Sequence, residues 1–282
     1  MKIPFFKYQG TGNDFVMIDQ RAQQFLQKSD VETINHLCDR RFGIGADGLI
    51  LLEIPKNSQN TDLSRDHREG GQFDFQMIYF NADGRESSMC GNGGRCLVAF
   101  ANYLNVFDKE CVFNAIDGLH DAKVRTDGWV ELKMIDVPKV EVGKDYYLLN
   151  TGSPHFIVFV EDLTDINVYE NGREIRYSER FYTEGVNVNF VEVRKDGSLE
   201  VATYERGVEA ETFSCGTGVT AAAIAYALKT DYAFKKNKAL SVPILTKGGN
   251  LEVRLQRSGK GIFQDIWLCG PATQAFKGEI EV

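Results

Sequence analysis

The sequence has no apolar run long enough to cross a membrane and no excess of positive charge. Its apolar stretches fall well short of the ~18 consecutive residues that a spanning helix needs. Residues 1–7 reach a second lysine too soon to hold the apolar core of a signal peptide. Lys and Arg number 32 against 40 Asp and Glu, a net charge of −8 that disfavours nucleic acid and anionic membranes as partners. These absences predict a cytoplasmic protein with a small-molecule partner.

No pair among the six cysteines has the C-x-x-C spacing that is typical of zinc and thioredoxin-like sites. An even cysteine count in a short secreted chain would indicate disulfides, but this chain has 282 residues and no recognisable export signal. We therefore expect reduced thiols and no metal, with most of the cysteines buried as small apolar side chains. The length itself predicts about two domains.

One short pattern occurs twice: residues 90–93 read Cys-Gly-Asn-Gly and residues 215–218 read Cys-Gly-Thr-Gly. Two weaker similarities follow the same order, residues 12–16 with 152–157 and residues 43–47 with 185–189. The polar stretch 55–72 is interpreted as a surface loop inserted into the first half only. Three similarities in one order predict an internal duplication.

The coarse pattern of apolar residues predicts two α/β halves. Strands are expected at residues 15–18, 49–52, 73–80, 130–134, 156–160, 188–193, 199–204 and 251–255, and helices at residues 31–42, at residues 170–181 and after each Cys-Gly element. Residues 96–104 and 219–228 are apolar nearly all round, which predicts a buried central helix in each half.

We predict an α/β (α+β) fold with two pseudo-symmetric domains, each a strongly curved, mainly antiparallel sheet or barrel around its central helix. The expected domains are residues 1–118 plus 270–282, which carry Cys90, and residues 119–269, which carry Cys215.

The two Cys-Gly elements have the chemistry of anion-binding helix entrances. Asn92 and Thr217 are strong N-cap residues, so we expect them to begin the two buried helices, with Cys90 and Cys215 just outside. Unpaired amides at a helix N-terminus attract an anion, and the adjacent glycines let a ligand approach closely. The same position stabilises a thiolate, which makes each cysteine a competent base or nucleophile.

Two such entrances, related by duplication, are expected to face one another across the domain cleft. A carboxylate held between them would have one thiol on each side of its α-carbon. One thiolate could then remove the α-proton while the other thiol returned a proton to the opposite face, which inverts the centre. No sequence feature indicates a pyridoxal cofactor, so we expect no cofactor and electrostatic stabilisation by the helix ends. The alternative is a pair of buried cysteines that merely begin two helices.

With these residues in hand, the sequence resembles the diaminopimelate epimerase family over nearly its whole length. The motifs that carry the resemblance are Gly12-Asn13-Asp14-Phe15, Gly43-Ile44-Gly45-Ala46-Asp47-Gly48, Phe80-Asn81-Ala82-Asp83-Gly84, Met89-Cys90-Gly91-Asn92-Gly93-Gly94-Arg95-Cys96, Tyr204-Glu205-Arg206-Gly207 and Ser214-Cys215-Gly216-Thr217-Gly218. The resemblance implies a cofactor-independent, two-thiol isomerase that interconverts LL- and meso-diaminopimelate for lysine and peptidoglycan synthesis. It also implies a homodimer.

The resemblance carries roles onto individual residues. It makes Cys90 and Cys215 the acid/base pair, and His155 and Glu205 the residues that tune the thiols. The substrate-binding positions that it implies are Asn13, Asn81, Gly91, Asn92, Asn187, Glu205, Arg206, Gly216 and Thr217. The bidentate fork of Arg206 suits the distal carboxylate of the substrate.

Two positions depart from the family pattern and bear on specificity. Ser153 stands where many members carry Asn, so a hydroxyl or a water replaces an amide contact to the distal end of the substrate. Gly48 stands where some members carry Gln, and the lost side chain mildly favours openness to other substrates.

Three other interpretations stay open. Residues 43–48 fit the dinucleotide motif G-x-G-x-x-G, but a helical stretch precedes them and a strand follows, the reverse of a Rossmann turn. A related racemase or epimerase, similar to proline racemase or to the phenazine-biosynthesis isomerases, would share the fold, although Arg206 and the asparagines favour a dicarboxylic substrate. A non-enzymatic redox switch would use Cys90 and Cys215 as a disulfide pair.

Overall fold

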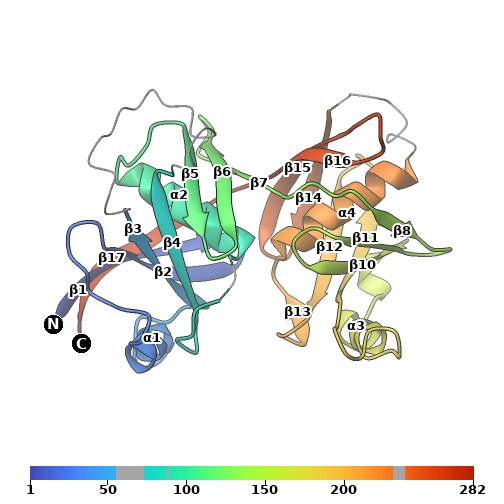
Figure 1. Ribbon diagram of the computed structural model, residues 1–282. Coiled ribbons are helices and arrows are strands. Elements are labelled where there is room, and N and C mark those ends of the chain that lie inside the picture. Colours follow the sequence, from blue (N-terminus) through green and yellow to red (C-terminus); the bar gives the residue numbers. More distant parts are fainter. Residues whose placement is uncertain (55–72, 88, 231–238) are drawn as a thin grey trace. The chain divides into compact units, whose positions relative to one another are not determined.

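The computed structural model describes residues 1–54, 73–87, 89–230 and 239–282 (Figure 1). The stretch 55–72, expected as an inserted loop, lies outside the described residues. The chain divides into unit 1, Met1–Leu132 with Pro271–Val282, and unit 2, Lys133–Gly270. The sequence predicts the boundary between the two domains after residue 118, whereas the first segment of unit 1 continues to Leu132. The chain stays in unit 1 beyond residue 118 because β6 (Gly118–Val124) pairs with both β5 (Glu110–Ala115) and β7 (Val130–Lys133).

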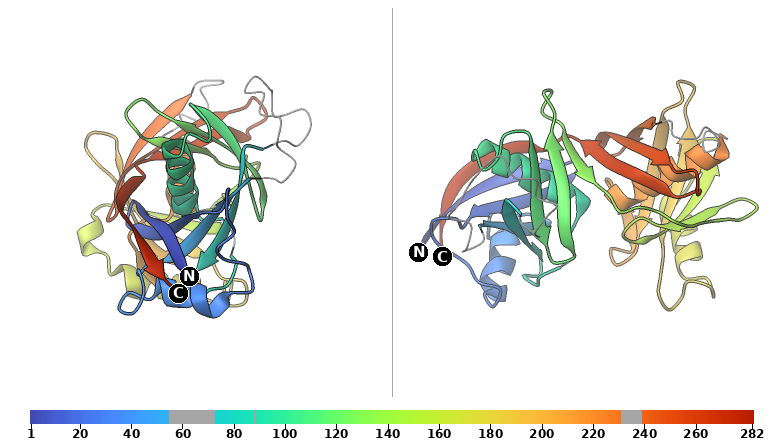
Figure 2. Two further views of the ribbon diagram at one scale, coloured as in Figure 1. Left: turned by 90° about the vertical axis from the view of Figure 1, so that its left-hand side faces the viewer. Right: turned by 45° about the horizontal axis from the view of Figure 1, so that its top comes forward.

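Unit 1 is a curved sheet wrapped around one helix. Its further elements are β1 (Lys2–Gly10), β2 (Asn13–Asp19), α1 (Val31–Cys38), β3 (Gly48–Glu53), β4 (Phe75–Asn81), α2 (Gly91–Tyr103) and β17 (Thr273–Glu281). Strands β17, β1 and β2 pair antiparallel, as do β3 with β4 and β5 with β6, whereas β2 with β3 and β4 with β5 are parallel. Helix α2 lies inside the curve of these strands (Figure 2).

Unit 2 repeats this plan. Its elements are β8 (Val140–Val142), β9 (Tyr147–Asn150), β10 (Pro154–Val160), the 3-10 helix Leu163–Asp165, α3 (Val168–Arg176), β11 (Asn187–Val193), β12 (Leu199–Glu205), β13 (Ala210–Thr212), α4 (Gly216–Lys229), β14 (Leu240–Thr246), β15 (Gly249–Arg257) and β16 (Phe263–Gly270). The pairs β10–β11 and β12–β14 are parallel, and β8–β9, β9–β10, β11–β12, β12–β13, β14–β15 and β15–β16 are antiparallel.

The two units therefore share one order of elements and one order of strand directions. In each unit, an antiparallel pair of strands is followed by a helix and by a strand that runs parallel to the second strand of the pair. This third strand pairs antiparallel with a fourth, and the central helix then connects the fourth strand to a further parallel strand. Sequence similarity at the glycine turns and equivalent topology together support the predicted duplication. The predicted class, two strand-rich α/β units each built around a buried helix, is confirmed.

The central helices are buried because nearly every side of each meets strands. In α2 the fully buried residues include Leu97, Phe100 and Arg95, and in α4 they include a nearly continuous run from Gly218 to Ala225. Burial on all sides lets small and apolar residues replace the usual polar face of a helix. Both helices thus hold their N-termini in fixed positions within their own units.

The predicted caps of these helices need correction. The structure makes Cys90 and Cys215 the N-caps, and the helices begin at Gly91 and Gly216. Both cysteines have extended backbones, and their carbonyl oxygens accept the first helical hydrogen bonds. Asn92 and Thr217 do not cap, because their side chains bond to other residues of the site described below. Each thiol is therefore two residues closer to the helix than predicted.

The first predicted helix, residues 31–42, is shorter than expected. Helix α1 ends at Cys38 because Asp39 has extended backbone angles and its carboxylate accepts hydrogen bonds from the amides of Arg41 and Phe42, both at 2.7 Å. This local turn competes with continuation of the helix. It leads the chain into β3.

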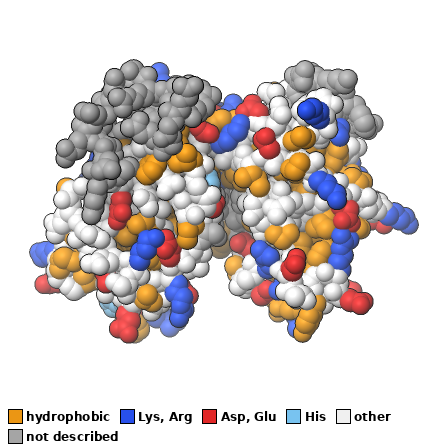
Figure 3. All heavy atoms as spheres, viewed as in Figure 1, with side chains coloured by type: hydrophobic (Ala, Val, Ile, Leu, Met, Phe, Trp, Pro, Cys, Tyr) orange, Lys and Arg blue, Asp and Glu red, His pale blue; other side chains and the backbone are white. Residues whose placement is uncertain are grey.

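Basic and acidic side chains are interspersed on the face shown in Figure 3. That distribution gives neither unit a field of one sign on this face, in keeping with a partner that is not a polyanion. Among the described residues, no helix is long and apolar enough to span a membrane.

Candidate active site

The entrance of α2 holds its side chains through a buried polar cluster. Asn92 is 1 % exposed; its Nδ2 donates to Asn13 Oδ1 at 2.7 Å, and its Oδ1 accepts from Arg95 Nη2 at 2.9 Å. The guanidinium of Arg95, fully buried, also donates to Thr11 Oγ1 at 2.9 Å. These bonds fix the first turn of the helix beside the partly exposed thiol of Cys90. Sequence reasoning missed Arg95, because a lone arginine gives no sign that it is buried.

Asn13 connects this cluster to a group of charged residues. Its Nδ2 donates to Asp47 Oδ2 at 2.9 Å. Arg40 bridges Asp14 and Asp47, with both Nη2 to oxygen distances at 2.7 Å, and Lys7 Nζ lies 2.8 Å from Asp14. Lys7 also donates to the carbonyl of Gly45. These charged residues hold the starts of β2 and β3 together, and so fix Asn13 at the start of β2.

These charges predict an acid-sensitive contribution to stability. Burial raises the pKa of Asp14, but hydrogen bonds from Arg40 and Lys7 outweigh burial and lower it to about 2. A carboxyl whose pKa is depressed on folding stabilises the protein above its unfolded pKa, and that stabilisation is lost as the pH falls toward 2. We expect the wild type to lose roughly 2 kcal/mol more free energy of unfolding than Asp14→Asn between pH 5 and pH 2. Urea unfolding of both proteins at pH 5 and pH 2 measures this difference. Equal losses of free energy of unfolding in the two proteins would contradict the prediction.

Asn81 and Gly48 lie opposite each other on β4 and β3. Asn81 is exposed at the end of its strand. A Cβ atom on Gly48 would lie 2.5 Å from Phe80 O and 2.6 Å from Tyr79 Cε2. The ring of Tyr79 thus occupies the space beside position 48.

In unit 2, the entrance of α4 is built around a buried histidine. His155 Nε2 lies 2.8 Å from Thr217 Oγ1, which in turn lies 3.4 Å from Cys215 Sγ. On the other side of the ring, Asn189 Nδ2 donates to His155 Nδ1 at 3.0 Å. Thr151 Oγ1 donates to the carbonyl of Thr217 at 2.8 Å. The predicted residues His155, Thr217 and Cys215 are therefore brought together.

His155 is uncharged in this site at neutral pH. Burial lowers its pKa most, and the positive charge of Arg206 lowers it further. The resulting pKa is about 3. A histidine with this pKa offers one N–H donor and one acceptor nitrogen, but no charge.

Beside the histidine, Asn187 and Arg206 form a second predicted cluster. Asn187 Nδ2 donates to Ser153 Oγ at 2.8 Å, and Asn187 Oδ1 accepts from the Arg206 amide at 2.9 Å. The Arg206 guanidinium donates to the carbonyl of Glu184 at 2.8 Å and lies 3.5 Å from Ser153 Oγ. Both acceptors are neutral, and among the described residues no carboxylate forms an ion pair with Arg206. A ligand carboxylate would supply the missing negative charge.

The Ser153 hydroxyl contacts both Asn187 and Arg206. We expect Ser153→Ala to raise KM about 3- to 10-fold with kcat nearly unchanged, because losing one neutral hydrogen bond costs ~1 kcal/mol. Steady-state kinetics separate the two constants. A fall in kcat at constant KM would show that Ser153 acts on the chemical step instead.

The carboxyl of Glu205 ends β12, next to Arg206. Burial raises its pKa.

All six cysteines are free. Burial raises the pKa of Cys38 and of Cys96 to about 12, and raises that of Cys111 well above its ordinary value. These three thiols are therefore protonated at neutral pH, and a protonated thiol is not a base. Cys269 is fully buried. The four remain packing residues, as the sequence predicts.

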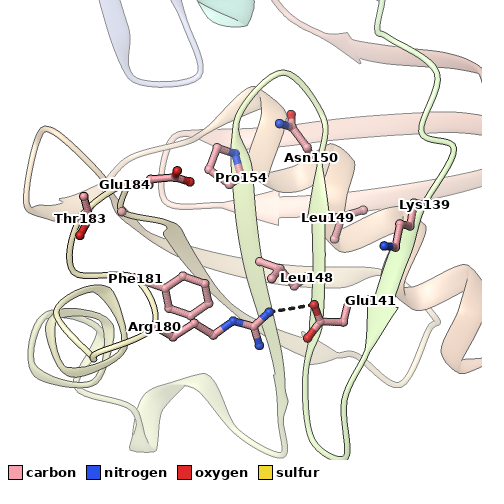
Figure 4. Close-up of a pocket in the computed structure, with 11 residues that line it drawn as sticks. Lys139, Glu141, Leu148, Leu149, Asn150, Pro154, Arg180, Phe181, Thr183 and Glu184 are labelled. Atoms are coloured by element: carbon pink, nitrogen blue, oxygen red, sulfur yellow. Dashed lines mark hydrogen bonds and ion pairs between the residues drawn. The ribbon is translucent and has the colours of Figure 1, made fainter.

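Unit 2 also has a cavity of about 700 Å³ next to the Arg206 cluster. It is lined by Lys139, Glu141, Leu148, Leu149, Asn150, Pro154, Arg180, Phe181, Thr183, Glu184 and Gly185. Arg180 and Glu141 form an ion pair at 2.8 Å at one side, and Pro154 and Glu184 lie at the other (Figure 4). The cavity borders the backbone that holds Asn187 and Arg206, but none of the predicted site residues lines it.

The fold has relatives among solved structures. The chain matches a Bacillus anthracis phenazine biosynthesis protein of the PhzF family with a TM-score of 0.73 and 12 % identity, each chain covered completely. It matches a hydroxyproline epimerase from Agrobacterium vitis with a TM-score of 0.63 and 14 % identity, covering 99 % of this chain and 92 % of that one. These likenesses define the class by fold: two-unit, strand-rich α/β proteins of the type found in PhzF proteins and hydroxyproline epimerase.

Sequence comparison assigns the family. The family model for diaminopimelate epimerase matches residues 5–140 and 147–273. The diaminopimelate epimerase of Flavobacterium psychrophilum is 47 % identical over 275 residues, covering 98 % of this chain and 99 % of the relative. That of a Hydrogenobaculum species is 36 % identical and covers 96 % of each chain. The chain belongs to the diaminopimelate epimerase family, a family of isomerases.

Proposed function

We propose that this protein is a cofactor-independent epimerase that converts LL-2,6-diaminopimelate to meso-diaminopimelate, with Cys90 and Cys215 as its acid/base pair. One observation carries the proposal: each unit places a cysteine as the N-cap of its buried central helix, at equivalent positions of the repeated fold. No other cysteine occupies such a position, and three of the other four are held protonated by burial.

The proposed reaction needs one proton taken and one returned. One cysteine, as thiolate, removes the α-proton from the substrate and becomes a thiol. The other cysteine, as thiol, donates its proton to the opposite face of the same carbon and becomes a thiolate. The configuration at that carbon is inverted, and the reverse reaction exchanges the two roles.

The helix N-termini would stabilise the charge that develops in this reaction. We propose that the amides of Gly91, Asn92, Gly216 and Thr217 bind the α-carboxylate of the substrate. As the α-proton leaves, negative charge spreads onto that carboxylate, and preorganised N–H donors stabilise it. Amides in the first turn of a helix have no helical acceptor, so they are available for this role.

The distal end of the substrate is assigned to the polar residues around the two entrances. Arg206 fits the distal carboxylate, because its guanidinium lacks a charged partner among the described residues. Asn13, Asn81, Asn187 and Glu205 are proposed to bind the remaining polar groups of the substrate. Holding the unreacting end aligns the reacting α-carbon with the thiols.

Isotope exchange tests this function. Incubation with LL-diaminopimelate in D₂O should place deuterium at the α-carbon as meso-diaminopimelate forms, without added pyridoxal phosphate or metal. Free proline and hydroxyproline in parallel incubations test the related activities. Labelling of these substrates and not of diaminopimelate would overturn the proposal.

We also propose a homodimer in the cytoplasm. Strand β17 is exposed along most of its length, and Phe276 on it is 49 % exposed, so unit 1 offers an exposed strand to a second copy. A reducing compartment is supported by the six free cysteines, since the proposed pair must stay reduced to act. Sedimentation equilibrium measures the first point, and a monomeric mass at micromolar concentration would contradict it.

A further inference from the structure

We propose that Asn189 and Thr203 are positioning residues that fix the ring of His155 in one tautomer, so that a directed chain of hydrogen bonds ends on Cys215 Sγ. We call the five residues Thr203, Asn189, His155, Thr217 and Cys215 the His155 chain. This inference rests on the proposed role of Cys215, and it concerns how the protein prepares that thiol.

The His155 chain is continuous in unit 2. Thr203 Oγ1 donates to Asn189 Oδ1 at 2.9 Å, Asn189 Nδ2 donates to His155 Nδ1 at 3.0 Å, and His155 Nε2 lies 2.8 Å from Thr217 Oγ1. The last link, Thr217 Oγ1 to Cys215 Sγ, is 3.4 Å. Thr203, Asn189 and His155 are each at most 3 % exposed. The first two links are therefore shielded from water, whereas Thr217 is partly exposed.

The direction of each bond follows from the orientation of the Asn189 amide. The carbonyl oxygen of Phe156 only accepts, so the Asn189 NH₂ group, 3.4 Å away, faces it and Oδ1 faces the Thr203 hydroxyl. The Asn189 NH₂ group then faces Nδ1 of His155, which must be the acceptor nitrogen of a neutral ring. The proton of the ring is consequently on Nε2 and points at Thr217. Because Thr217 Oγ1 accepts there, its own O–H is left to donate to the sulfur of Cys215.

The room for this arrangement comes from the glycine that ends the Cys-Gly-Thr-Gly motif. A Cβ atom on Gly218 would lie 2.4 Å from Asn189 Oδ1 and 3.3 Å from Thr203 Oγ1. Any other residue at position 218 would displace the two residues that orient the histidine. Gly218 thus serves the His155 chain in addition to the close approach of a ligand.

The equivalent position in unit 1 is used differently. Asn92 corresponds to Thr217 in the repeat, but its side chain bonds to Asn13 and Arg95. No described histidine occupies the place of His155 in that cluster. The duplication has therefore kept the two cysteines and diverged in the groups around them, so the chain acts on Cys215 alone.

The consequence is a thiolate stabilised by an oriented donor. A hydrogen bond from a hydroxyl to an anion is stronger than one to a neutral group. Each hydrogen of the chain stays on its own heavy atom during the reaction, so the chain lowers the energy of the Cys215 thiolate without itself transferring a proton. Removal of the last link should lower the fraction of Cys215 present as thiolate about 10-fold.

Thiol alkylation in the absence of substrate tests the proposal independently of the proposed function. Iodoacetamide labelling of the full-length protein, followed by peptide mass spectrometry, gives the rates of Cys215 and Cys90 in one sample. We expect Thr217→Val to slow Cys215 about 10-fold and to leave Cys90 unchanged, while Thr217→Ser retains most of the rate. Equal Cys215 rates in wild type and Thr217→Val would overturn the proposal.

The positioning role is tested with Thr203→Val and the matched control Thr220→Val. Thr220 is fully buried on α4, but its hydroxyl bonds to the carbonyl of Gly216, outside the chain. ¹⁵N NMR of the histidine rings should show the Nε2-protonated form of His155 in wild type and in Thr220→Val, and a mixture or the other tautomer in Thr203→Val. An unchanged tautomer and an unchanged Cys215 rate in a folded Thr203→Val protein would show that Thr203 is merely structural.

Discussion

Replacing Cys215 with serine is expected to lower kcat for epimerisation by about 10³-fold or more. A serine hydroxyl keeps the size of the side chain, but it is far too weakly acidic to form the anion that removes an α-proton. General acid or base catalysis contributes about 10²- to 10⁴-fold, and the proposed reaction needs both groups in one turnover. Cys90→Ser should have an effect of the same size for the same reason.

The isotope readout separates the two variants. In D₂O, each single variant retains one thiol, so slow exchange of the α-proton without inversion remains possible for one stereoisomer only. Cys38→Ala is the matched control, because Cys38 is 3 % exposed and burial raises its pKa to about 12. We expect this variant to keep kcat within a factor of 2 while losing some stability. Near-normal epimerisation in either serine variant would refute the two-thiol account.

Replacing Arg206 with methionine is expected to raise KM by roughly 100-fold. The guanidinium donates to neutral oxygens of Glu184 and Ser153, and no carboxylate among the described residues forms an ion pair with it. A carboxylate of the substrate can therefore bind there as its negatively charged partner. Loss of a charged hydrogen-bonding partner costs about 2–5 kcal/mol when the other charge is desolvated. We expect a smaller fall in kcat, because a loosely held distal end leaves the α-carbon less well aligned.

Arg206→Lys tests whether geometry or charge matters. Lysine keeps the charge and loses the bidentate fork, so an intermediate rise in KM of about 10-fold is expected. Arg194→Lys is the control, because Arg194 forms an exposed ion pair with Glu200 at 3.7 Å, and such pairs contribute little. Unchanged KM in Arg206→Met, measured with LL-diaminopimelate, would remove Arg206 from the substrate site.

Much of the fold was predictable because its strongest signals are local. The continuous apolar run that forms β3 is buried on both faces, and such a run is hard to misread. The apolar sequences that follow Cys90 and Cys215 predicted that α2 and α4 are buried. The strands that went unpredicted, such as β6 and β17, carry exposed and polar residues, so their pairing depends on neighbours distant in the sequence.

The candidate site was predictable only in part, for a related reason. Residue types and spacing identify Cys90, Cys215 and the glycines, since a helix entrance is local chemistry. They do not identify Arg95, Asn189 or Thr203, because those residues act through partners on other strands and helices. The predicted caps failed on the same ground: Asn92 and Thr217 cap well in isolation, but in the fold they bond to Asn13 and to His155.

The most direct test of the central claim is a crystal structure with diaminopimelate or an unreactive analogue of it bound. The account predicts the sulfur atoms of Cys90 and Cys215 on opposite faces of the same α-carbon, with its carboxylate on the amides of both helix entrances. A bound analogue whose α-carbon is approached by only one of the two sulfur atoms would contradict it.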